Sequence, residues 1–160
     1  MSCHARKLVT AGYRALGRAG RSVAYLGRQE THPIMNRHAL SWFEISVADF
    51  DRARTFYSTI FAFDMPEQTF GPVRMGFFLH DREQGGIGGA IVHNPEFYTP
   101  SADGAKVYLN GGDDLAVVLE RVPAAGGEVI IPKRAIGEGM GHMGMFRDSE
   151  GNVVALHSPN

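Results

Sequence analysis

The chain has 160 residues, which is enough for one domain that buries a core. Its formal net charge of −1 gives no electrostatic signature of a nucleic-acid or membrane partner, and we expect neither. The single cysteine, Cys3, excludes an internal disulfide, and no apolar run approaches the roughly 18 residues of a membrane span. We therefore expect a cytoplasmic protein whose fold depends on its core.

Residues 1–37 differ in composition from the rest of the chain. The first 34 residues contain six basic side chains and one acidic one, so they carry +5 and leave −6 for the remainder. Apolar residues are too sparse there to bury much surface. Three interpretations of this basic leader stay open: a disordered extension, a translation start placed upstream of Met35, and an organellar transit peptide, which is also rich in arginine and poor in acids.

From residue 38 onward, the pattern starts with a strand followed by a helix. Residues 42–47 alternate in character, which predicts a strand with two different faces. Its apolar face carries Phe43, Ile45 and Val47, and its other face carries Trp42, Glu44 and Ser46. Residues 53–61 then show an apolar stripe with helical spacing, and Asp49 is well placed to cap that helix.

The same order of elements occurs twice. The first helix is followed by predicted strands at 65–70, 73–80 and 87–93. The second copy has a strand at 106–110, a helix opening at Asp113 or Asp114, and strands at 128–132, 140–147 and 152–157. Alignment of His93 with His157 gives an offset of 64 residues, and alignment of Asp49 with Asp114 gives 65. These landmarks predict two modules, at about 38–95 and 104–160.

Three stretches carry a family resemblance, namely 42–49 (WFEISVAD), 51–57 (DRARTFY) and 146–152 (FRDSEGN). In this order and spacing they resemble the glyoxalase/bleomycin resistance protein/dioxygenase group, the vicinal oxygen chelate superfamily. The resemblance covers residues 38–160. It implies an α+β fold in which paired βαβββ modules form a cupped mixed β-sheet, with the helices outside and a small-molecule ligand inside.

The alternation of each strand then predicts which side chains look into the cup. On the first strand these are Trp42, Glu44 and Ser46. On the fourth strand of module one we expect Ala90 and Val92 to pack against the helices, with Gly89, Ile91 and His93 facing inward. On the last strand Ala155 and His157 are expected to face inward.

Metal-dependent members of this superfamily imply four ligand positions. On this chain those positions fall on Trp42, on Gly89 or Ile91, on Val107 and on Ala155. None of these side chains can bind a metal ion. The usual four-ligand glyoxalase site, and with it a standard lactoylglutathione lyase, is therefore not expected.

Polar side chains stand two residues beyond three of those positions: Glu44, His93 and His157. One carboxylate and two imidazoles form a possible ligand set for a divalent metal such as Fe, Zn, Ni or Mn, although no cofactor is certain. Without a metal, Glu44 and His157 are the predicted catalytic acid and base. Structural roles stay open for all three residues. The predicted substrate-binding residues are Trp42, Phe78, His93, Tyr108 and His142.

Two main functions remain open. One is an enzyme that acts on a small oxygenated or carbonyl-bearing metabolite by isomerase, lyase or dioxygenase-type chemistry. The other is a metal-free protein of the bleomycin-resistance type that binds and sequesters a small molecule. A degenerate domain that serves only in assembly is a third possibility. The resemblance also implies a homodimer.

Overall fold

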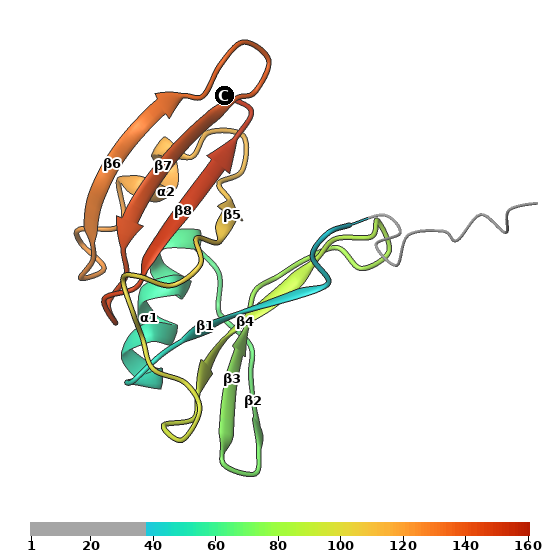
Figure 1. Cartoon of the computed structure of the whole chain (residues 1–160), viewed down its shortest axis with the longest axis vertical. Helices are drawn as coiled ribbons and strands as arrows, with labels where there is room; N and C mark the ends of the chain where they lie inside the picture. Colours follow the sequence, from blue (N-terminus) through green and yellow to red (C-terminus); the bar gives the residue numbers. More distant parts are fainter. Residues whose placement is uncertain (1–37) are drawn as a thin grey trace, which may run out of the picture. The chain divides into compact units, whose positions relative to one another are not determined.

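The computed structural model describes residues 38–160, so the basic leader predicted at 1–37 lies outside the described residues. The first module consists of β1 (Trp42–Ser46), α1 (Phe50–Phe61), β2 (Glu67–Phe70), β3 (Val73–Phe77) and β4 (Gly88–His93). The second consists of β5 (Tyr108–Asn110), α2 (Ala116–Leu119), β6 (Glu128–Ala135), β7 (His142–Arg147) and β8 (Val153–Ser158). Figure 1 shows the two modules, each with its own sheet.

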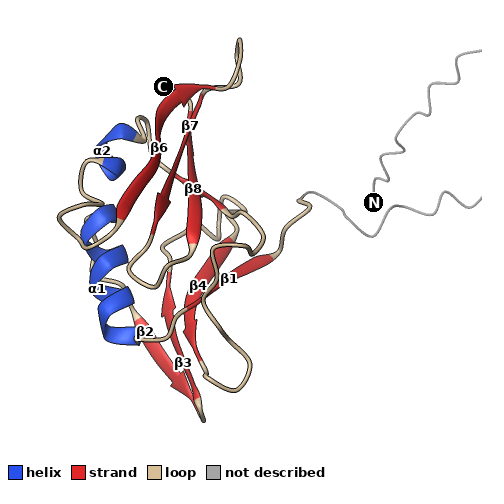
Figure 2. Cartoon of the chain, turned by 60° about the vertical axis from the view of Figure 1, so that its left-hand side comes forward, coloured by secondary structure: helices blue, strands red, loops and turns tan. Residues whose placement is uncertain are grey.

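Each module forms one four-stranded mixed sheet. The strand order is β1-β4-β3-β2 in the first, here called sheet A, and β5-β8-β7-β6 in the second, sheet B. The first strand of each module pairs in parallel with the last, and the other pairs are antiparallel. Figure 2 shows both helices on the same side of the strands. The predicted α+β fold of paired βαβββ modules is confirmed.

The core lies on the helix side of both sheets and follows the repeat. In sheet A, Ile91 pairs with Ile45 on one side and with Gly76 on the other. In sheet B, Leu156 pairs in the same way with Leu109 and Gly144. The four aliphatic side chains of these two rows are buried in one continuous apolar cluster with α1 and α2. The apolar stripe of α1 adds Ala53, Phe56, Tyr57 and Ile60, all almost fully buried.

A buried polar network joins the two modules at the turn between β7 and β8. Asp148, which is 3% exposed, accepts hydrogen bonds from the Tyr57 hydroxyl at 2.7 Å and from the Asn152 backbone and side-chain nitrogens at 2.9 Å. The Asn152 side chain also donates to the Ser46 carbonyl at 3.0 Å. The motif at 146–152 therefore ties β8 to α1 and to the end of β1.

Glu150 forms a second connection in the same turn. Its side chain accepts from the backbone amides of Ala48 and Asp49, at 3.0 and 2.8 Å, and from Arg52 at 2.7 Å. Burial alone would raise the pKa of Glu150, but the hydrogen bonds from Arg52 and the two amides outweigh it and hold that pKa below its ordinary value of 4.5. Asp49 in turn caps α1, as predicted, by accepting from the Arg52 amide at 3.0 Å.

The predicted facing of β4 is wrong. Ile91, expected to face inward, is buried against the helices, while Ala90 and Val92 pair with Glu44 and Ser46 on the opposite face. The cause is the alignment of His93 with His157. In the strand pairing, Ile91 holds the position in sheet A that Leu156 holds in sheet B, an offset of 65 residues. The counterpart of His157 is therefore Val92 and not His93. A shift of one residue reverses every side chain of a strand.

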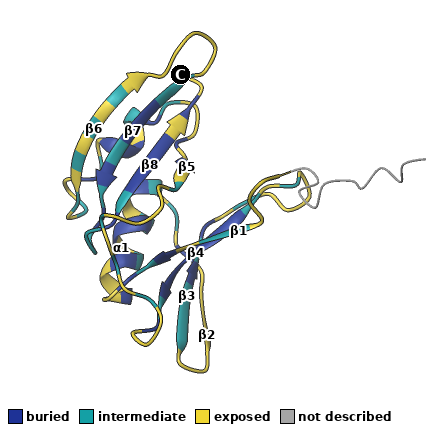
Figure 3. Cartoon of the chain, viewed as in Figure 1, coloured by how far each residue is buried: buried dark blue, intermediate teal, exposed yellow. Residues whose placement is uncertain are grey.

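Strand β6 also differs from its prediction because it continues past Pro132 to Ala135. Proline is tolerated there because β6 is an edge strand, and two irregularities in its pairing with β7 accommodate the extra residues. Figure 3 shows how exposed this edge is.

Within residues 38–160, no helix is long and apolar enough to cross a membrane.

Candidate functional site

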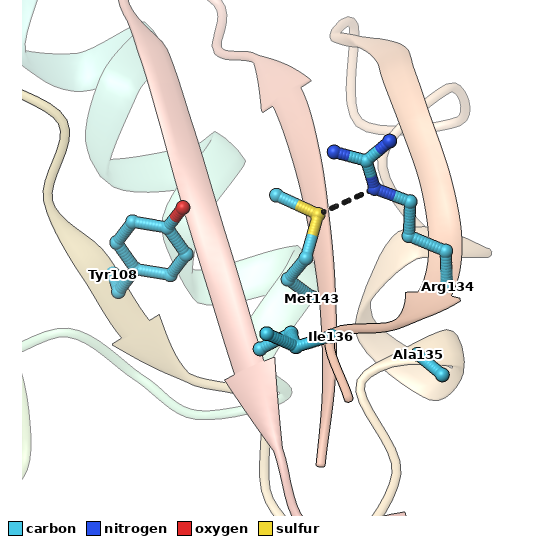
Figure 4. Close-up of a pocket in the computed structure, with 5 residues that line it drawn as sticks. All are labelled: Tyr108, Arg134, Ala135, Ile136 and Met143. Atoms are coloured by element: carbon cyan, nitrogen blue, oxygen red, sulfur yellow. Dashed lines mark hydrogen bonds between the residues drawn. The ribbon is translucent and has the colours of Figure 1, made fainter. Parts of the chain in front are cut away.

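Two neighbouring hollows lie on the face of sheet B that points away from the helices. This surface, and its counterpart on sheet A, are called the open faces below. The first hollow encloses about 420 Å³ (Figure 4) and is lined by Tyr108, Arg134, Ala135, Ile136 and Met143. The second encloses about 510 Å³ and is lined by Tyr108, Leu109, Asn110, His157 and Pro159. Tyr108, which is 51% exposed, borders both hollows from the edge strand β5.

The open face of sheet B is built in two rows by the strand pairing. Tyr108, Ala155 and Met145 form one row across β5, β8 and β7. Asn110, His157 and Met143 form the next, and Arg134 on β6 extends it. Ala155, which lies between Tyr108 and Met145 in this row, is small and fully buried. The surface thus combines soft apolar groups with a phenol, an amide, an imidazole and a guanidinium.

Arg134 is the charged side chain of this surface. Its Nε donates to the Met143 sulfur at 3.2 Å, and Figure 4 shows this contact beside Tyr108. Among residues 38–160 no carboxylate oxygen lies within 4.0 Å of its guanidinium. A guanidinium offers several N–H groups in a planar fork that matches carboxylate and other oxygen groups. Arg134 is thus equipped to bind an oxygen-bearing ligand.

His157 lies beside the same surface with a defined ring orientation. Its Nε2 lies 3.0 Å from the Met140 carbonyl oxygen. A carbonyl can only accept, so Nε2 must carry a proton in this contact. In a neutral imidazole Nδ1 is then the basic nitrogen. His157 therefore has one nitrogen engaged by the loop between β6 and β7 and one left to accept a proton.

On the open face of sheet A, Glu44 is exposed and held by two neutral donors. Trp42 Nε1 donates to one carboxylate oxygen at 3.2 Å, and the Tyr98 hydroxyl donates to the other. The hydrogen bond to Glu44 is the main cause that raises the pKa of Tyr98. Tyr98 follows a turn after β4 in which its amide bonds to the Asn94 carbonyl at 2.9 Å. This turn returns the tyrosine to the sheet.

The residues do not fit the metal that the resemblance implies. His93 is on the helix side of β4, where it pairs laterally with Arg74, so it does not share a face with Glu44. His157 belongs to the other sheet, and within the described part of the chain no three His, Cys, Asp or Glu side chains are grouped to hold a metal ion. The residues of β4 that lie on the open face are Gly88, Ala90 and Val92. Their side chains cannot bind a metal ion, and neither can those of Gly89 and Ile91, the positions expected from the resemblance. The predicted triad of Glu44, His93 and His157 does not come together.

The five predicted substrate-binding residues separate into two groups. Trp42 and Tyr108 lie on open faces. Phe78 instead is a core residue, 9% exposed, with its ring 5.2 Å from that of Tyr57 and 5.4 Å from that of Phe43. His93 lies on the helix side of β4.

His142 lies on the helix side of sheet B, because it precedes the open-face residue Met143 and pairs with Ser158. Its Nδ1 is buried without a hydrogen-bond partner among the described residues. It lies near Asp114, whose pKa is lowered mainly by Lys133, then by the Ala116 amide, and further by the charge of His142. Neither histidine therefore lines an open face.

Two residues of these surfaces escaped the sequence analysis. Arg134 was missed because the strand was expected to end at residue 132. Tyr98 was missed because it stands in the connector between the modules, where no periodic pattern predicts a side-chain direction. The proline-rich composition of that connector was the available signal, and it indicated only a loop.

Comparison with known proteins agrees with the fold. A family model described as Glyoxalase/Bleomycin resistance protein/Dioxygenase superfamily matches residues 39–156. No curated protein matches the chain. Among solved structures, an antibiotic binding protein from a Streptomyces species is 24% identical with a TM-score of 0.56, covering 79% of this chain and 99% of that one.

Two further solved structures illustrate the range of similar proteins. A glyoxalase-related enzyme from Fulvimarina pelagi is 18% identical with a TM-score of 0.54, over 74% of this chain and 86% of that one. Glyoxalase I from Zea mays is 16% identical with a TM-score of 0.55, over 74% of this chain but only 44% of the maize protein. At these identities the likeness establishes the fold alone.

Proposed function

Because the chain belongs to the glyoxalase/bleomycin resistance protein/dioxygenase superfamily, we propose that it binds a small oxygenated or carbonyl-bearing molecule on the open face of sheet B. The observation that carries this proposal is the pair of hollows beside Tyr108, the first of which is lined by Arg134, a side chain without a carboxylate partner among residues 38–160. An aromatic or unsaturated ligand would lie against Met143 and Tyr108, and its oxygen would accept from Arg134 and the Tyr108 hydroxyl.

Binding and sequestration, without the four-ligand metal site, is the mode that the arrangement favours. The predicted acid Glu44 and the predicted base His157 lie on different sheets and are hydrogen-bonded to different partners. We further propose that the protein acts in the cytoplasm as a homodimer.

Catalysis is the second candidate, and His157 is the observation that favours it. Its Nδ1 would be the proton acceptor beside a ligand held by Tyr108, since Nε2 is committed to the Met140 carbonyl. A His157→Gln variant that retains ligand binding but loses turnover of that ligand would identify this role. Unchanged turnover would eliminate it.

Benzoate is a suitable first probe because it joins an aromatic ring to a carboxylate. Titration followed by amide NMR shifts should show saturable binding on β5, β7 and β8, with a Kd of about 1 mM or weaker for so small a molecule. Arg134→Gln should weaken this binding at least tenfold, and Tyr108→Phe should weaken it a few-fold. Arg82→Gln is the matched control because that arginine lies outside the hollows.

Failure of benzoate and of its neutral analogue benzyl alcohol to shift any sheet B amide would contradict the proposal. Equal affinity in wild type and Arg134→Gln would remove Arg134 from it.

The proposed homodimer is supported by apolar side chains around the hollows, such as Ile136, 42% exposed, and Met140, 60% exposed. Light scattering should give twice the chain mass of 17.5 kDa. Ile136→Asp should shift the protein toward the monomer, because it places a charge in the apolar contact. A monomeric wild type at micromolar concentration would contradict the dimer.

A further inference from the structure

The open face of sheet A contains a carboxylate without a cationic partner. Among residues 38–160 no lysine, arginine or histidine nitrogen lies within 4.0 Å of Glu44. Both of its hydrogen-bond donors, the Trp42 indole and the Tyr98 hydroxyl, are neutral. They fix the direction of the carboxylate, but they leave its negative charge uncompensated.

Aromatic rings surround this carboxylate. The Trp42 ring lies 6.2 Å from the Phe77 ring at 57°, and 6.5 Å from the His80 ring at 77°. Gly88 makes the second contact possible, since a Cβ at that position would collide with the His80 ring. Trp42 is therefore held between two rings, and its position beside Glu44 is fixed by packing.

Glu44 and Phe77 belong to one row of the open face of sheet A. Ala90 pairs with Glu44 on one side and with Phe77 on the other, so the three residues form one row across β1, β4 and β3. The Ala90 methyl group is fully buried, and the rings of Trp42 and Phe77 approach to 6.2 Å. Both rings are half-buried, so the surface beside Glu44 that a ligand can reach consists of their exposed parts.

A negative charge and the faces of aromatic rings attract the same kind of ligand. The π face of tryptophan, tyrosine or phenylalanine binds cations, and a desolvated cation gains most from it. A single carboxylate is a poor ligand set for a metal ion, and Glu44 belongs to no metal-competent group in residues 38–160. An organic cation has no such requirement, because it needs only charge and apolar contact.

We propose that Trp42, Glu44, Phe77 and Tyr98, here called the Glu44 site, bind an organic cation: a protonated amine or a quaternary ammonium group carried on an apolar body. The cation lies on the exposed parts of the Trp42 and Phe77 rings, with its charge toward the Glu44 carboxylate. The Glu44 site shares no residue with the hollows on sheet B, so it stands independently of the function proposed for them.

The test uses the fact that Trp42 is the only tryptophan in the chain, so that intrinsic fluorescence reports on this site. Benzyltrimethylammonium and benzylammonium are the probes, titrated into the full-length protein. Phenylacetate and benzyl alcohol are the anionic and neutral controls of similar size. We expect saturable fluorescence changes with one or both cations, weakened by added salt, and at least tenfold weaker binding of the two controls.

Glu44→Gln should weaken binding of the cation at least tenfold, because the amide keeps the shape but lacks the charge. Its oxygen can still accept from Trp42, and its NH2 group can donate to the Tyr98 hydroxyl oxygen. Tyr98→Phe should weaken it less, since it removes only one orienting hydrogen bond. Glu96→Gln, on the exposed turn that precedes Tyr98, is the matched control and should bind like wild type.

Equal affinity of wild type and Glu44→Gln for both cations, or equal binding of cations and controls, would overturn the proposal. So would the absence of any change in Trp42 fluorescence with either cation at concentrations up to tens of millimolar.

Discussion

The open faces of the two sheets occupy the same place in the repeat but carry different chemistry. Glu44, Ala90 and Phe77 on sheet A match Tyr108, Ala155 and Met145 on sheet B through identical pairing. In the next row, Ser46, Val92, Met75 and Gln68 match Asn110, His157, Met143 and Arg134. Within residues 38–160, one face has a carboxylate without an ionic partner beside aromatic rings, and the other has a guanidinium without one beside methionines.

The helix side of the sheets shows the opposite behaviour. Ile45 and Leu109, Ile91 and Leu156, and Gly76 and Gly144 occupy matching positions with closely similar residues. Packing constrains these positions, because a core at crystal-like density tolerates few changes of volume. On the open faces Glu44, Tyr108 and Arg134 are exposed instead, so these side chains are available for binding. The repeat therefore encodes the same scaffold twice and a binding surface in two distinct versions.

The largest expected effect concerns the network that joins the two modules. Asp148→Asn removes a buried acceptor that serves the Tyr57 hydroxyl and Asn152, and it introduces N–H groups that face those donors. We expect a loss of about 3 kcal/mol in the free energy of unfolding, measured by urea denaturation. The exposed Asp103→Asn is the matched control and should change stability by less than about 0.5 kcal/mol. A loss below about 1 kcal/mol for Asp148→Asn would show that the network does not hold the modules together.

The equivalence of the two core rows can be tested by matched glycine substitutions. A Cβ on Gly76 would meet Met65 Sδ at 2.7 Å and Ile91 Cγ1 at 2.9 Å, and one on Gly144 would meet Leu119 Cδ1 at 2.8 Å. Gly76→Ala and Gly144→Ala should each lower the free energy of unfolding by about 1–3 kcal/mol, since overpacking costs that much. Gly71 cannot serve as the control for these substitutions. Its surroundings are open, but its φ of 57° would strain an alanine for a different reason. If only one of the pair destabilises, the two rows are not equivalent.

Acid should weaken the connection formed by Glu150. Its pKa in the folded protein is below the ordinary 4.5, so the stabilisation is fully present above about pH 4.5 and is lost as the pH falls through the folded pKa. The difference in unfolding free energy between wild type and Glu150→Gln should therefore shrink between pH 5 and pH 3. Glu120→Gln, an exposed substitution at the C-cap of α2, should show no such dependence. A constant difference across this range would contradict the assigned role.

Substitutions on the open faces should have the smallest effect on stability. Glu44→Gln, Tyr108→Phe and Arg134→Gln all change exposed side chains and leave the core rows intact. Thermal unfolding should show changes within about 0.5 kcal/mol for each. A loss above about 1.5 kcal/mol in any of them would indicate a structural role for that side chain and would weaken its assignment to binding.

The sequence predicted the fold because its signals are local. Alternation at 42–47, helical spacing at 53–61 and the turn at 148–152 each depend on near neighbours, and the structure contains the corresponding elements. The facing of β1 and β8 was also correct, with Ile45 and Leu156 in the core. The motifs therefore sufficed for the architecture.

The candidate site was less predictable because it depends on register and on irregular backbone. An error of one residue in the alignment of His93 with His157 was enough to place Ile91 on the wrong face. Arg134 lies in the part of β6 beyond Pro132 that was not predicted as strand, and Tyr98 reaches the open face of sheet A only through a turn. None of these features has a period that a sequence pattern reveals.

The most direct test of two chemically distinct faces is a crossed titration. Benzoate and benzyltrimethylammonium would each be titrated, with amide NMR detection, into wild type, Glu44→Gln and Arg134→Gln. We expect benzyltrimethylammonium to shift amides of β1, β3 and β4 and to lose affinity only in Glu44→Gln. Benzoate should shift amides of β5, β7 and β8 and lose affinity only in Arg134→Gln. Shifts by both probes on one sheet, or loss of both by the same single variant, would contradict the assignment of the two faces.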